Sequence, residues 1–445
     1  MLETLNTLLW GPGTLALILG TGAWLTLRTG GFPQRNLGRA LALSLGREAR
    51  RKGRGGVSPV GSLMTALAST VGTGNIVGVA AALVSGGPGA LVWMELAALL
   101  GLAAKFAECM LAVKYRRVRR DGTRWGGPMA VMETRLGSAG AVLGRFYALF
   151  ALLMAFAMGA MAQSGALADT LSAAFTLPRW RVGLVTAALA LTILLGGIRR
   201  IAEISTVLVP VMALLYLGGG LAVILGNLRR LPEALILMLR CAVAPEAALG
   251  GALGIVTRRE ALRWGVARSV FSNEAGLGSA AITAACADTE EPVKQGLISM
   301  TGVFFDTMVI CTVTGLAIYC SGTLGAADGN GHPLTGAALT LRAFETVLGP
   351  LAPWLIGAAL GLFAFTSVLG CAVQAETTAS YLLGPEAVRP CRVLYGLAVF
   401  VGAVIPMATV LQLADLANAL MAFPNLVCLL LLSGEIAGEC GRKER

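Results

Sequence analysis

Long apolar stretches separated by short polar connectors dominate the chain. A helix that crosses a bilayer needs about 20 largely apolar residues, and eleven segments of the 445-residue chain approach or exceed that length. They are 8–27, 60–85, 89–113, 141–172, 182–198, 203–226, 265–286, 297–321, 352–375, 391–406 and 409–433. A further apolar stretch, 233–257, is short and rich in glycine, and we interpret it as an interfacial or half-helix piece. The pattern predicts an all-α polytopic membrane protein with about 11 transmembrane helices.

The composition supports this class and argues against an enzyme. Hydrophobic residues make up 56% of the chain and charged residues 13%, whereas soluble proteins contain about 45–50% and about 25%. The 58 glycines lie within apolar runs, as in closely packed transmembrane helices. One histidine and nine scattered cysteines leave little room for metal or triad chemistry. Because the sequence contains no catalytic motif and no segment for a soluble domain, we expect one membrane domain and no enzymatic activity.

The charge indicates an orientation. The net charge is +11, and basic residues of membrane proteins gather in cytoplasmic connectors. Connectors 28–54 and 114–124 and the end 441–445 are basic and fall on one side, so we predict a multi-pass protein of the cell (plasma) membrane with its N-terminus outside and its C-terminus cytoplasmic. A nucleic-acid partner is not expected. The arginine cluster 258–268 falls on the outer side, against the rule, although long or re-entrant connectors are exempt from it.

Two of the predicted spans are interrupted in the middle. Segment 69–75 (STVGTGN) places two glycines and four polar side chains at mid-membrane depth, and segment 272–279 (SNEAGLGS) has the same character. Backbone that lacks hydrogen bonds is costly in lipid, so such breaks persist where they line a cavity or bind a ligand. The alternative is close helix packing through Gly-x-Gly, which needs neither the amides nor the carboxylate found here.

The two interrupted spans lie five spans apart and therefore cross the membrane in opposite directions. Paired broken helices in two inverted halves are the best sequence indicator of a transporter binding site. Half-helix N-termini offer N–H groups to a carboxylate, and unwound carbonyls offer oxygen ligands to a small cation. We therefore favour a secondary transporter over a channel, which usually needs symmetric repeats from several subunits.

At these residues the sequence resembles the alanine or glycine:cation symporter family of the amino acid–polyamine–organocation superfamily. The matching segments are 70–80 (TVGTGNIVGVA), 86–90 (GGPGA), 105–108 (KFAE), 271–279 (FSNEAGLGS) and 421–426 (MAFPNL). They span nearly the whole chain in family order. The resemblance implies a five-plus-five inverted repeat with a leucine-transporter-like fold and one extra N-terminal helix. In the single domain 1–445, residues 1–57 would hold the extra helix and its basic connector, 58–230 the first repeat and 231–435 the second.

The resemblance also implies sodium-coupled uptake of alanine or glycine, with sodium as a transported ion and not a tightly bound cofactor. The expected partners are a small amino acid and the lipid bilayer, with no obligatory protein partner. The residues carried over for the substrate are Thr73, Gly74 and Asn75, whose N–H groups would hold the carboxylate, with Gln163, Phe271, Ser272 and Asn273 facing it. Those for sodium are the carbonyls of Ala68 and Val71 and the hydroxyls of Thr366 and Ser367.

Three questions stay open at this point. Glu274 and Asp306 are ionisable residues within predicted spans, and such residues are functional candidates. They would titrate if the coupling ion were a proton. The run Cys371–Ala372–Val373–Gln374 departs from the family, which usually carries Trp and two aromatic or polar residues there. A pocket with small walls would accept alanine, glycine or serine, since a methyl group decides only about 1–3 kcal/mol.

Overall fold

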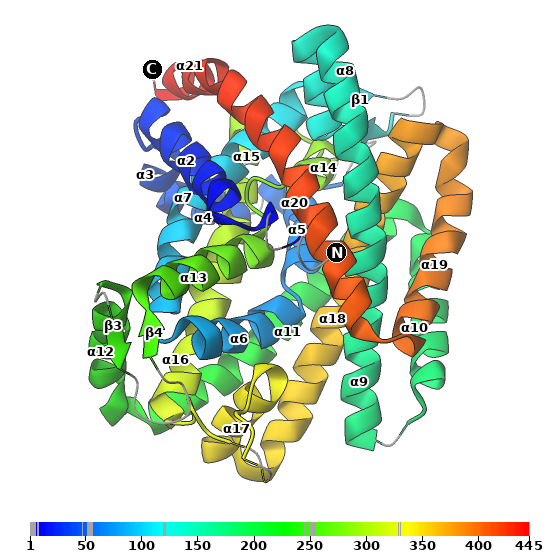
Figure 1. Cartoon of the computed structure of the whole chain (residues 1–445). Helices are drawn as coiled ribbons and strands as arrows, with labels where there is room; N and C mark the ends of the chain where they lie inside the picture. The colour runs from blue at the N-terminus through cyan, green and yellow to red at the C-terminus, as the bar shows by residue number, and fades with distance from the viewer. Residues whose placement is uncertain are drawn as a thin grey trace.

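A computed structural model describes residues 6, 9–46, 48–50, 57–118, 122–175, 177–243, 246–248, 255–327, 329 and 331–444. The described chain is mainly α-helical, with two short antiparallel strand pairs, β1–β2 and β3–β4 (Figure 1). The predicted all-α membrane class is therefore confirmed. The first elements are α2 (Pro12–Arg28), α3 (Phe32–Arg35), α4 (Leu37–Leu45), η1 (Glu48–Arg50), α5 (Pro59–Thr70), η2 (Thr73–Asn75), α6 (Val77–Gly86), α7 (Gly89–Lys114), β1 (Arg117–Val118) and β2 (Arg124–Trp125).

The remaining elements complete the bundle. The middle of the chain forms α8 (Pro128–Met154), η3 (Ala155–Ala162), α9 (Gln163–Phe175), α10 (Arg179–Leu194), α11 (Gly197–Gly226), η4 (Leu228–Arg230), α12 (Leu231–Val243), β3 (Glu246–Ala248) and β4 (Ile255–Thr257). The last part forms α13 (Arg258–Asn273), α14 (Ser279–Ala285), α15 (Pro292–Val303), η5 (Phe304–Cys311), α16 (Thr312–Ser321), α17 (Gly336–Leu348), η6 (Gly349–Leu351), α18 (Ala352–Leu383), η7 (Pro385–Ala387), α19 (Val388–Val404), α20 (Met407–Leu431) and α21 (Ser433–Glu444).

Each of the eleven predicted spans lies on a helix or a helix pair. By length and apolar composition, seven helices among the described residues could cross a membrane, and the bent pair α5–α6 raises this to eight. The other three predicted spans correspond to α2 and α10, which have 17 and 16 residues, and to α13–α14, whose first half carries four arginines. The exact number of spans and the inverted repeat therefore stay predictions.

The helix ends follow local sequence rules. Ser58 caps α5, because its side-chain oxygen accepts a hydrogen bond from the Gly61 N–H at 3.0 Å, and Pro59 occupies the first turn. α8 bends at Gly137, whose φ is +62°, so its first part lies apart from the predicted span 141–172. The predicted half-helix piece 233–257 contains α12 and the pair β3–β4, and its residues 244, 245 and 249–254 lie outside the described ones.

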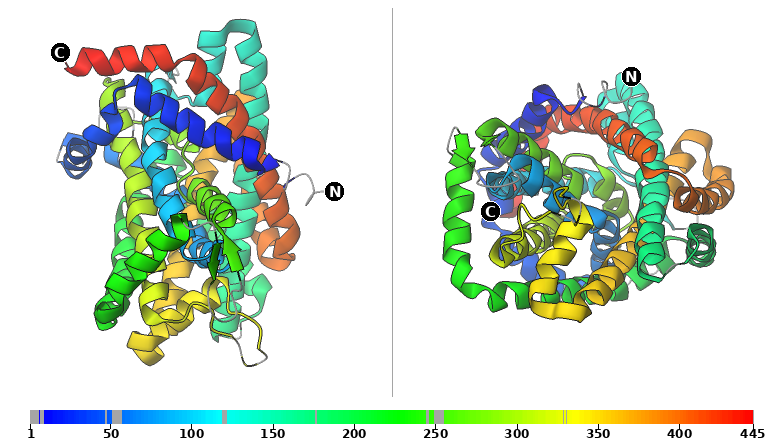
Figure 2. Two further views of the ribbon diagram at one scale, coloured as in Figure 1. Left: turned by 60° about the vertical axis from the view of Figure 1, so that its left-hand side comes forward. Right: turned by 60° about the horizontal axis from the view of Figure 1, so that its bottom comes forward.

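The helices surround α7 and α5. α7 packs against α13, α14 and α15, whereas α5 packs between α11 and α18. α10 and α19 pack on each other at the rim of the bundle (Figure 2, right). The C-terminal α21 lies at the same end of the molecule as α3 and α4, and α12 and α17 lie at the opposite end (Figure 1). The basic connectors and the C-terminus thus share one end, as the charge pattern predicts.

Candidate functional site: two broken helices and their contacts

The first break separates α5 from α6, which are bent by 62° relative to each other. The Asn75 side chain holds this break, because its Oδ1 accepts the Gly72 N–H at 3.0 Å. The N–H groups of Thr73 and Gly74 find no acceptor among the described residues. Both residues are half-buried. Two backbone donors are therefore free at the position where the sequence predicts that a carboxylate binds.

Asn75 also joins the two broken helices to a third element. Its Nδ2 lies 2.8 Å from Asp306 Oδ1 and 3.0 Å from Ser272 Oγ. The Ser272 hydroxyl in turn donates to Asp306 Oδ2 at 2.6 Å. Asn75 and Asp306 are fully buried. The side chains of Asn75 and Ser272 thus point to Asp306, and they stabilise the break between α5 and α6 from the side of η5.

The second break is held by charged side chains at membrane depth. Glu274 has a φ of +53°, and Gly276 and Gly278 have φ values of +84° and +80°, which favour glycine. Lys105 Nζ donates to the Glu274 carbonyl at 3.0 Å and lies 3.3 Å from Glu108 Oε1. Glu108 Oε2 accepts the Gly278 N–H at 3.0 Å. The buried pair Lys105–Glu108 therefore satisfies backbone groups that the interrupted helix leaves unpaired.

Three further polar side chains complete this support. Asn425 of α20 donates to Glu108 Oε2 at 3.0 Å and to the Gly276 carbonyl at 2.9 Å. Asn273 accepts the Ala275 N–H at 2.9 Å and donates to Thr307 Oγ1 at 3.0 Å. Glu274 accepts a hydrogen bond from the Ser279 hydroxyl. The Asn273 side chain therefore serves the unwound backbone, whereas the Glu274 carboxylate is bonded to the side chain of Ser279 at the start of α14.

Two π-helical segments flank the breaks. η5 carries Asp306, and η3 ends directly before Gln163. π-helical turns inside α-helices are frequent at functional sites, because the extra residue re-aims the side chains around it. Here they place one acidic and one amide side chain on opposite sides of the first break.

A second group of predicted residues meets on the other side of the first break. A Cβ built on Gly72 would lie 2.8 Å from Ser367 Oγ and 3.6 Å from the Gln163 amide. Thr73 Oγ1 lies 3.4 Å from Gln163 Oε1. Ser367 Oγ is buried and has no hydrogen-bond partner among the described residues. This side of the break therefore contains a free hydroxyl beside the unwound backbone, where Gly72 leaves room for it.

The last turn of α5 contributes carbonyl oxygens. The Val71 N–H donates to Leu67, and the Gly72 N–H is taken by Asn75, so the Ala68 carbonyl has no donor within the described chain. The Val71 carbonyl likewise has none. Both residues are buried, at 0% and 1% exposure. Buried carbonyls normally have a partner, and neutral oxygens suit a hard cation.

Thr366 faces a different neighbour from Ser367. Its hydroxyl donates to the carbonyls of Leu362 and Phe363, at 2.9 and 3.0 Å, and lies 3.2 Å from Met212 Sδ of α11. The structure thus places Ser367 beside Gly72, next to Val71 in the chain, and turns the Thr366 hydroxyl toward α11. α18 approaches α5 closely at Gly370, because a Cβ on Gly370 would lie 2.4 Å from the Ser69 nitrogen.

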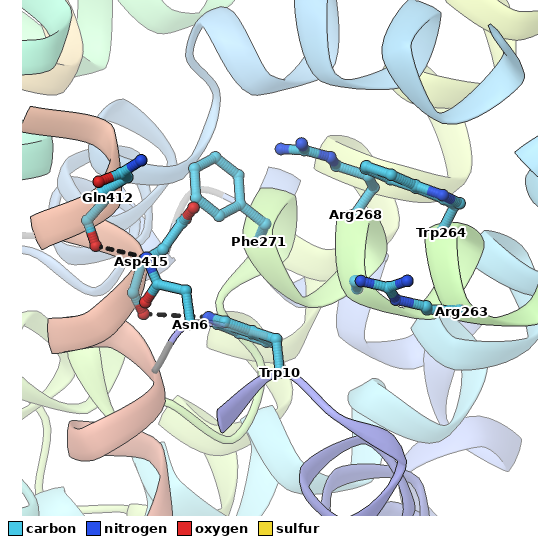
Figure 3. Close-up of a pocket in the computed structure, with 9 residues that line it drawn as sticks. Asn6, Trp10, Arg263, Trp264, Arg268, Phe271, Gln412 and Asp415 are labelled. Atoms are coloured by element: carbon cyan, nitrogen blue, oxygen red, sulfur yellow. Dashed lines mark hydrogen bonds between the residues drawn. The ribbon is translucent and has the colours of Figure 1, made fainter. Parts of the chain in front are cut away.

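Phe271 lies between the first break and a cavity. A Cβ on Gly74 would lie 3.6 Å from the Phe271 ring. On its other side Phe271 lines a cavity of about 340 Å³, with Arg268 from α13 and Asp415 from α20 (Figure 3). Asn6 and Trp10 close one wall by donating to the carbonyls of Gln412 and Asp415. Phe271 therefore separates this cavity from the free N–H groups at the break.

Backbone hydrogen bonds and ion pairs connect the segments that precede α5 and follow α14, near the end of the molecule that carries α21. Val57, which precedes α5, exchanges backbone hydrogen bonds with Cys286 and Asp288, which follow α14, at 3.3 and 2.7 Å. Arg124 pairs with Asp288 and, at 2.8 Å, with Glu290. The start of α5 and the end of α14 are thus joined by backbone bonds, and ion pairs attach β2 to the segment that follows α14.

The run that departs from the family lies on α18 beside η3. Gly159 of η3 faces Cys371, since a Cβ on Gly159 would lie 2.2 Å from the Cys371 Cβ. A bulky aromatic residue at position 371 would not fit against η3 in this arrangement. Gln374 is 1% exposed, and neither polar atom of its amide has a partner among the described residues.

The structure divides the predicted site residues into two groups, apart from Thr366, whose hydroxyl is bonded within α18. Ala68, Val71, Thr73, Gly74, Gln163, Phe271 and Ser367 surround the free donors and acceptors of the first break. Asn75, Ser272, Asn273, Glu274 and Asp306 are engaged in supporting the breaks. The sequence did not reveal that Lys105, Glu108 and Asn425 hold the second break. Their signal was present as charges and an amide within apolar spans, which need a partner.

The fold and the site define the class: a multi-pass membrane transporter with two broken helices at its centre. The model of the sodium:alanine symporter family matches residues 1–441, and the chain belongs to this family. It is 41% identical to the sodium/alanine symporter AgcS of Methanococcus maripaludis over 99% of this chain and 96% of that protein. It is 43% identical to an uncharacterized transporter of Haemophilus influenzae over 97% of this chain and 92% of that protein.

A solved structure shows the same fold. MhsT in complex with L-phenylalanine superposes with a TM-score of 0.61 at 15% identity, covering 85% of this chain and 90% of that chain. This similarity confirms the leucine-transporter-like fold. The family and its relatives are transporters, so the expectation that the chain is not an enzyme is confirmed.

Proposed function

We propose that the chain is a secondary active symporter that couples sodium entry to the uptake of a small neutral amino acid, alanine or glycine. The observation that carries this proposal is the group of unpartnered oxygens beside the first break: the carbonyls of Ala68 and Val71 and the hydroxyl of Ser367. Charge-free oxygen ligands suit sodium. Among the described residues, no cluster of three or more His, Cys, Asp or Glu could hold another metal.

The substrate would bind at the same break. The free N–H groups of Thr73 and Gly74 lie at the start of a short helical turn and suit a carboxylate. Gln163 and Phe271 supply a polar and an aromatic wall. The Phe271 ring lies in van der Waals range of Gly74, so the space is small, which favours a small side chain. The relative named as a sodium/alanine symporter supports this substrate class.

Transport would proceed by alternating access. In the present arrangement the backbone bonds of Val57 and the Arg124–Asp288 pair close the end that carries α21. The charge pattern supports a cytoplasmic position of this end, with the C-terminus inside and the N-terminus outside. Substrate would enter from the cavity of Arg268 and Asp415, pass Phe271 and reach the break. Release would require the inner bonds to open.

The rival coupling ion is a proton. Glu274 and Asp306 are buried carboxylates within the two supports, and one of them would carry the proton. In that case uptake would follow a pH gradient and ignore sodium. Oxygens without donors beside the break are unnecessary for proton coupling, which is why we favour sodium.

Uptake by the purified chain in proteoliposomes tests the proposal. We expect labelled alanine or glycine to accumulate under an inward sodium gradient, and not under a potassium gradient or a pH gradient alone. Serine and glutamine added in excess would establish how far the site tolerates larger side chains. Accumulation driven by a proton gradient without sodium would reject sodium coupling, and no gradient-dependent accumulation of any small amino acid would reject symport.

A further inference from the structure

The arginine cluster at the start of α13 borders an apolar groove. Arg258, Arg259 and Arg263 are exposed, and none of them forms a salt bridge with a described residue. Together with Glu260 they carry a formal charge of +2. Arg263 lies over the Trp264 ring, 5.8 Å from its centre. Arg263 also lines the cavity from which substrate would enter, whereas Arg258 and Arg259 line neither that cavity nor the supports of the breaks.

A groove of about 760 Å³ runs between α2 and α13 next to this cluster. Its apolar lining consists of Leu15, Ala16 and Leu19 from α2 and Leu262 from α13. Arg259, Glu260 and Arg263 lie along its α13 wall. Figure 2 (left) shows α2 crossing the outside of the bundle. The groove therefore combines an apolar channel with two guanidinium groups.

The bilayer determines what such a groove meets. Unpaired guanidinium groups are costly in the hydrocarbon region, which favours a position of the arginine cluster at the level of the lipid headgroups. Lipid phosphates occupy that level, and guanidinium groups bind phosphate oxygens in bidentate geometry. The apolar side chains beside them offer a surface to an acyl chain, because α2 consists almost entirely of apolar residues and small polar ones.

We propose that this groove binds one anionic phospholipid of the surrounding leaflet. Its phosphate contacts Arg259 and Arg263, and one acyl chain lies along Leu15, Ala16 and Leu19. The positive charge of the cluster selects an anionic headgroup over a zwitterionic one. Because α13 continues to Phe271 and Ser272 at the break, a lipid that bridges α2 and α13 also stabilises the outer half of the second broken helix.

Lipid titration of the purified full chain in neutral detergent tests this site independently of transport. We expect native mass spectra to show saturable binding of one dioleoylphosphatidylglycerol, with at least tenfold weaker binding of dioleoylphosphatidylcholine. Phosphatidylglycerol should also raise the unfolding temperature. The double variant Arg259→Gln/Arg263→Gln should lose about tenfold in phosphatidylglycerol affinity. The matched control Arg229→Gln removes another exposed arginine, outside this groove, and should bind as the native chain does.

A second variant tests the acyl-chain contact without changing charge. Ala16 is exposed within the groove, so Ala16→Trp should fill it and weaken phosphatidylglycerol binding about tenfold, while the unfolding temperature without lipid stays unchanged. Excess inorganic phosphate should not displace the lipid. Equal binding of both lipids, native affinity in the arginine double variant, or displacement by phosphate alone would each overturn the proposal. A lipid-free dimer that dissociates in the arginine variant would instead identify an interface between two copies and would also overturn it.

Discussion

The side-chain amide of Asn75 donates a hydrogen bond of 2.8 Å to Asp306 Oδ1. This bond links the break between α5 and α6 to η5, and Ser272 adds the end of α13 to the same carboxylate. Residues whose sequence context indicates a substrate-binding role are thus first of all the connection between the two broken helices. Their loss should affect the fold as well as transport.

We expect Asn75→Ala and Asp306→Ala each to destabilise the protein, because each leaves buried polar partners unpaired. The two changes should be non-additive, with a coupling energy of about 0.5–3 kcal/mol. Thermal unfolding of both single variants and the double variant in detergent measures this coupling. Additive effects would mean that the 2.8 Å contact does not stabilise the break.

Ser367 is the most direct test of the cation site. Ser367→Ala should raise the sodium concentration for half-maximal alanine uptake roughly tenfold to a hundredfold, since a polar contact to a charged group contributes about 1.5–3 kcal/mol. Thr366→Val should have a smaller effect, because the Thr366 hydroxyl is bonded within α18. Thr378→Val is the matched control, since its hydroxyl donates to Gln374 of the same helix. Unchanged sodium dependence in Ser367→Ala would remove Ser367 from the site.

Lys105 is expected to be essential for the second break. Lys105→Met leaves Glu108 as an unpaired buried charge and should cost about 3–5 kcal/mol, measured as a lower unfolding temperature. Adding Glu108→Gln should recover part of this loss, because the neutral amide no longer needs the ammonium group. Arg342→Met breaks an exposed pair with Glu345 and should change stability by less than about 1 kcal/mol. A Lys105 variant as stable as this control would contradict the supporting role.

The proposed closure of the end that carries α21 can be followed through Cys286. This cysteine is buried and lines a cavity at the end that carries α21. In a chain whose other eight cysteines are replaced, Asp288→Asn should speed labelling of Cys286 by an impermeant maleimide added from the side that carries α21, because it weakens the pair with Arg124. Glu133→Gln weakens the pair with Arg117, which is more exposed, and should not change the rate. Equal rates of Cys286 labelling in both variants would show that the Arg124–Asp288 pair does not hold the end that carries α21 closed.

The position of both breaks was predictable from the sequence. Glycine and polar residues in the middle of an apolar span indicate an interrupted helix, whatever the rest of the fold. The roles of the residues within the breaks were less predictable. Asn75 and Thr73 are two positions apart, yet the Asn75 side chain supports the break, whereas the Thr73 N–H is a free donor and its hydroxyl lies against Gln163. That difference depends on which helix packs on each side of the break, and this packing cannot be inferred from the spacing of the residues.

The sequence by itself determined the class of protein, the approximate position of each helix and the family, since hydrophobic span length and motif order are local properties of the chain. Only the tertiary structure decided which polar groups of the broken helices find hydrogen-bond partners. Lys105, Glu108 and Asn425 come from two helices far apart in sequence and meet at Gly276 and Gly278. Gly370 brings α18 against Ser69 of α5, and among the described residues Ser367 and the carbonyls of Ala68 and Val71 stay unpartnered. Hydrogen bonding in a bilayer has to be completed within the protein, so the packing of distant helices decides which groups remain free for a ligand.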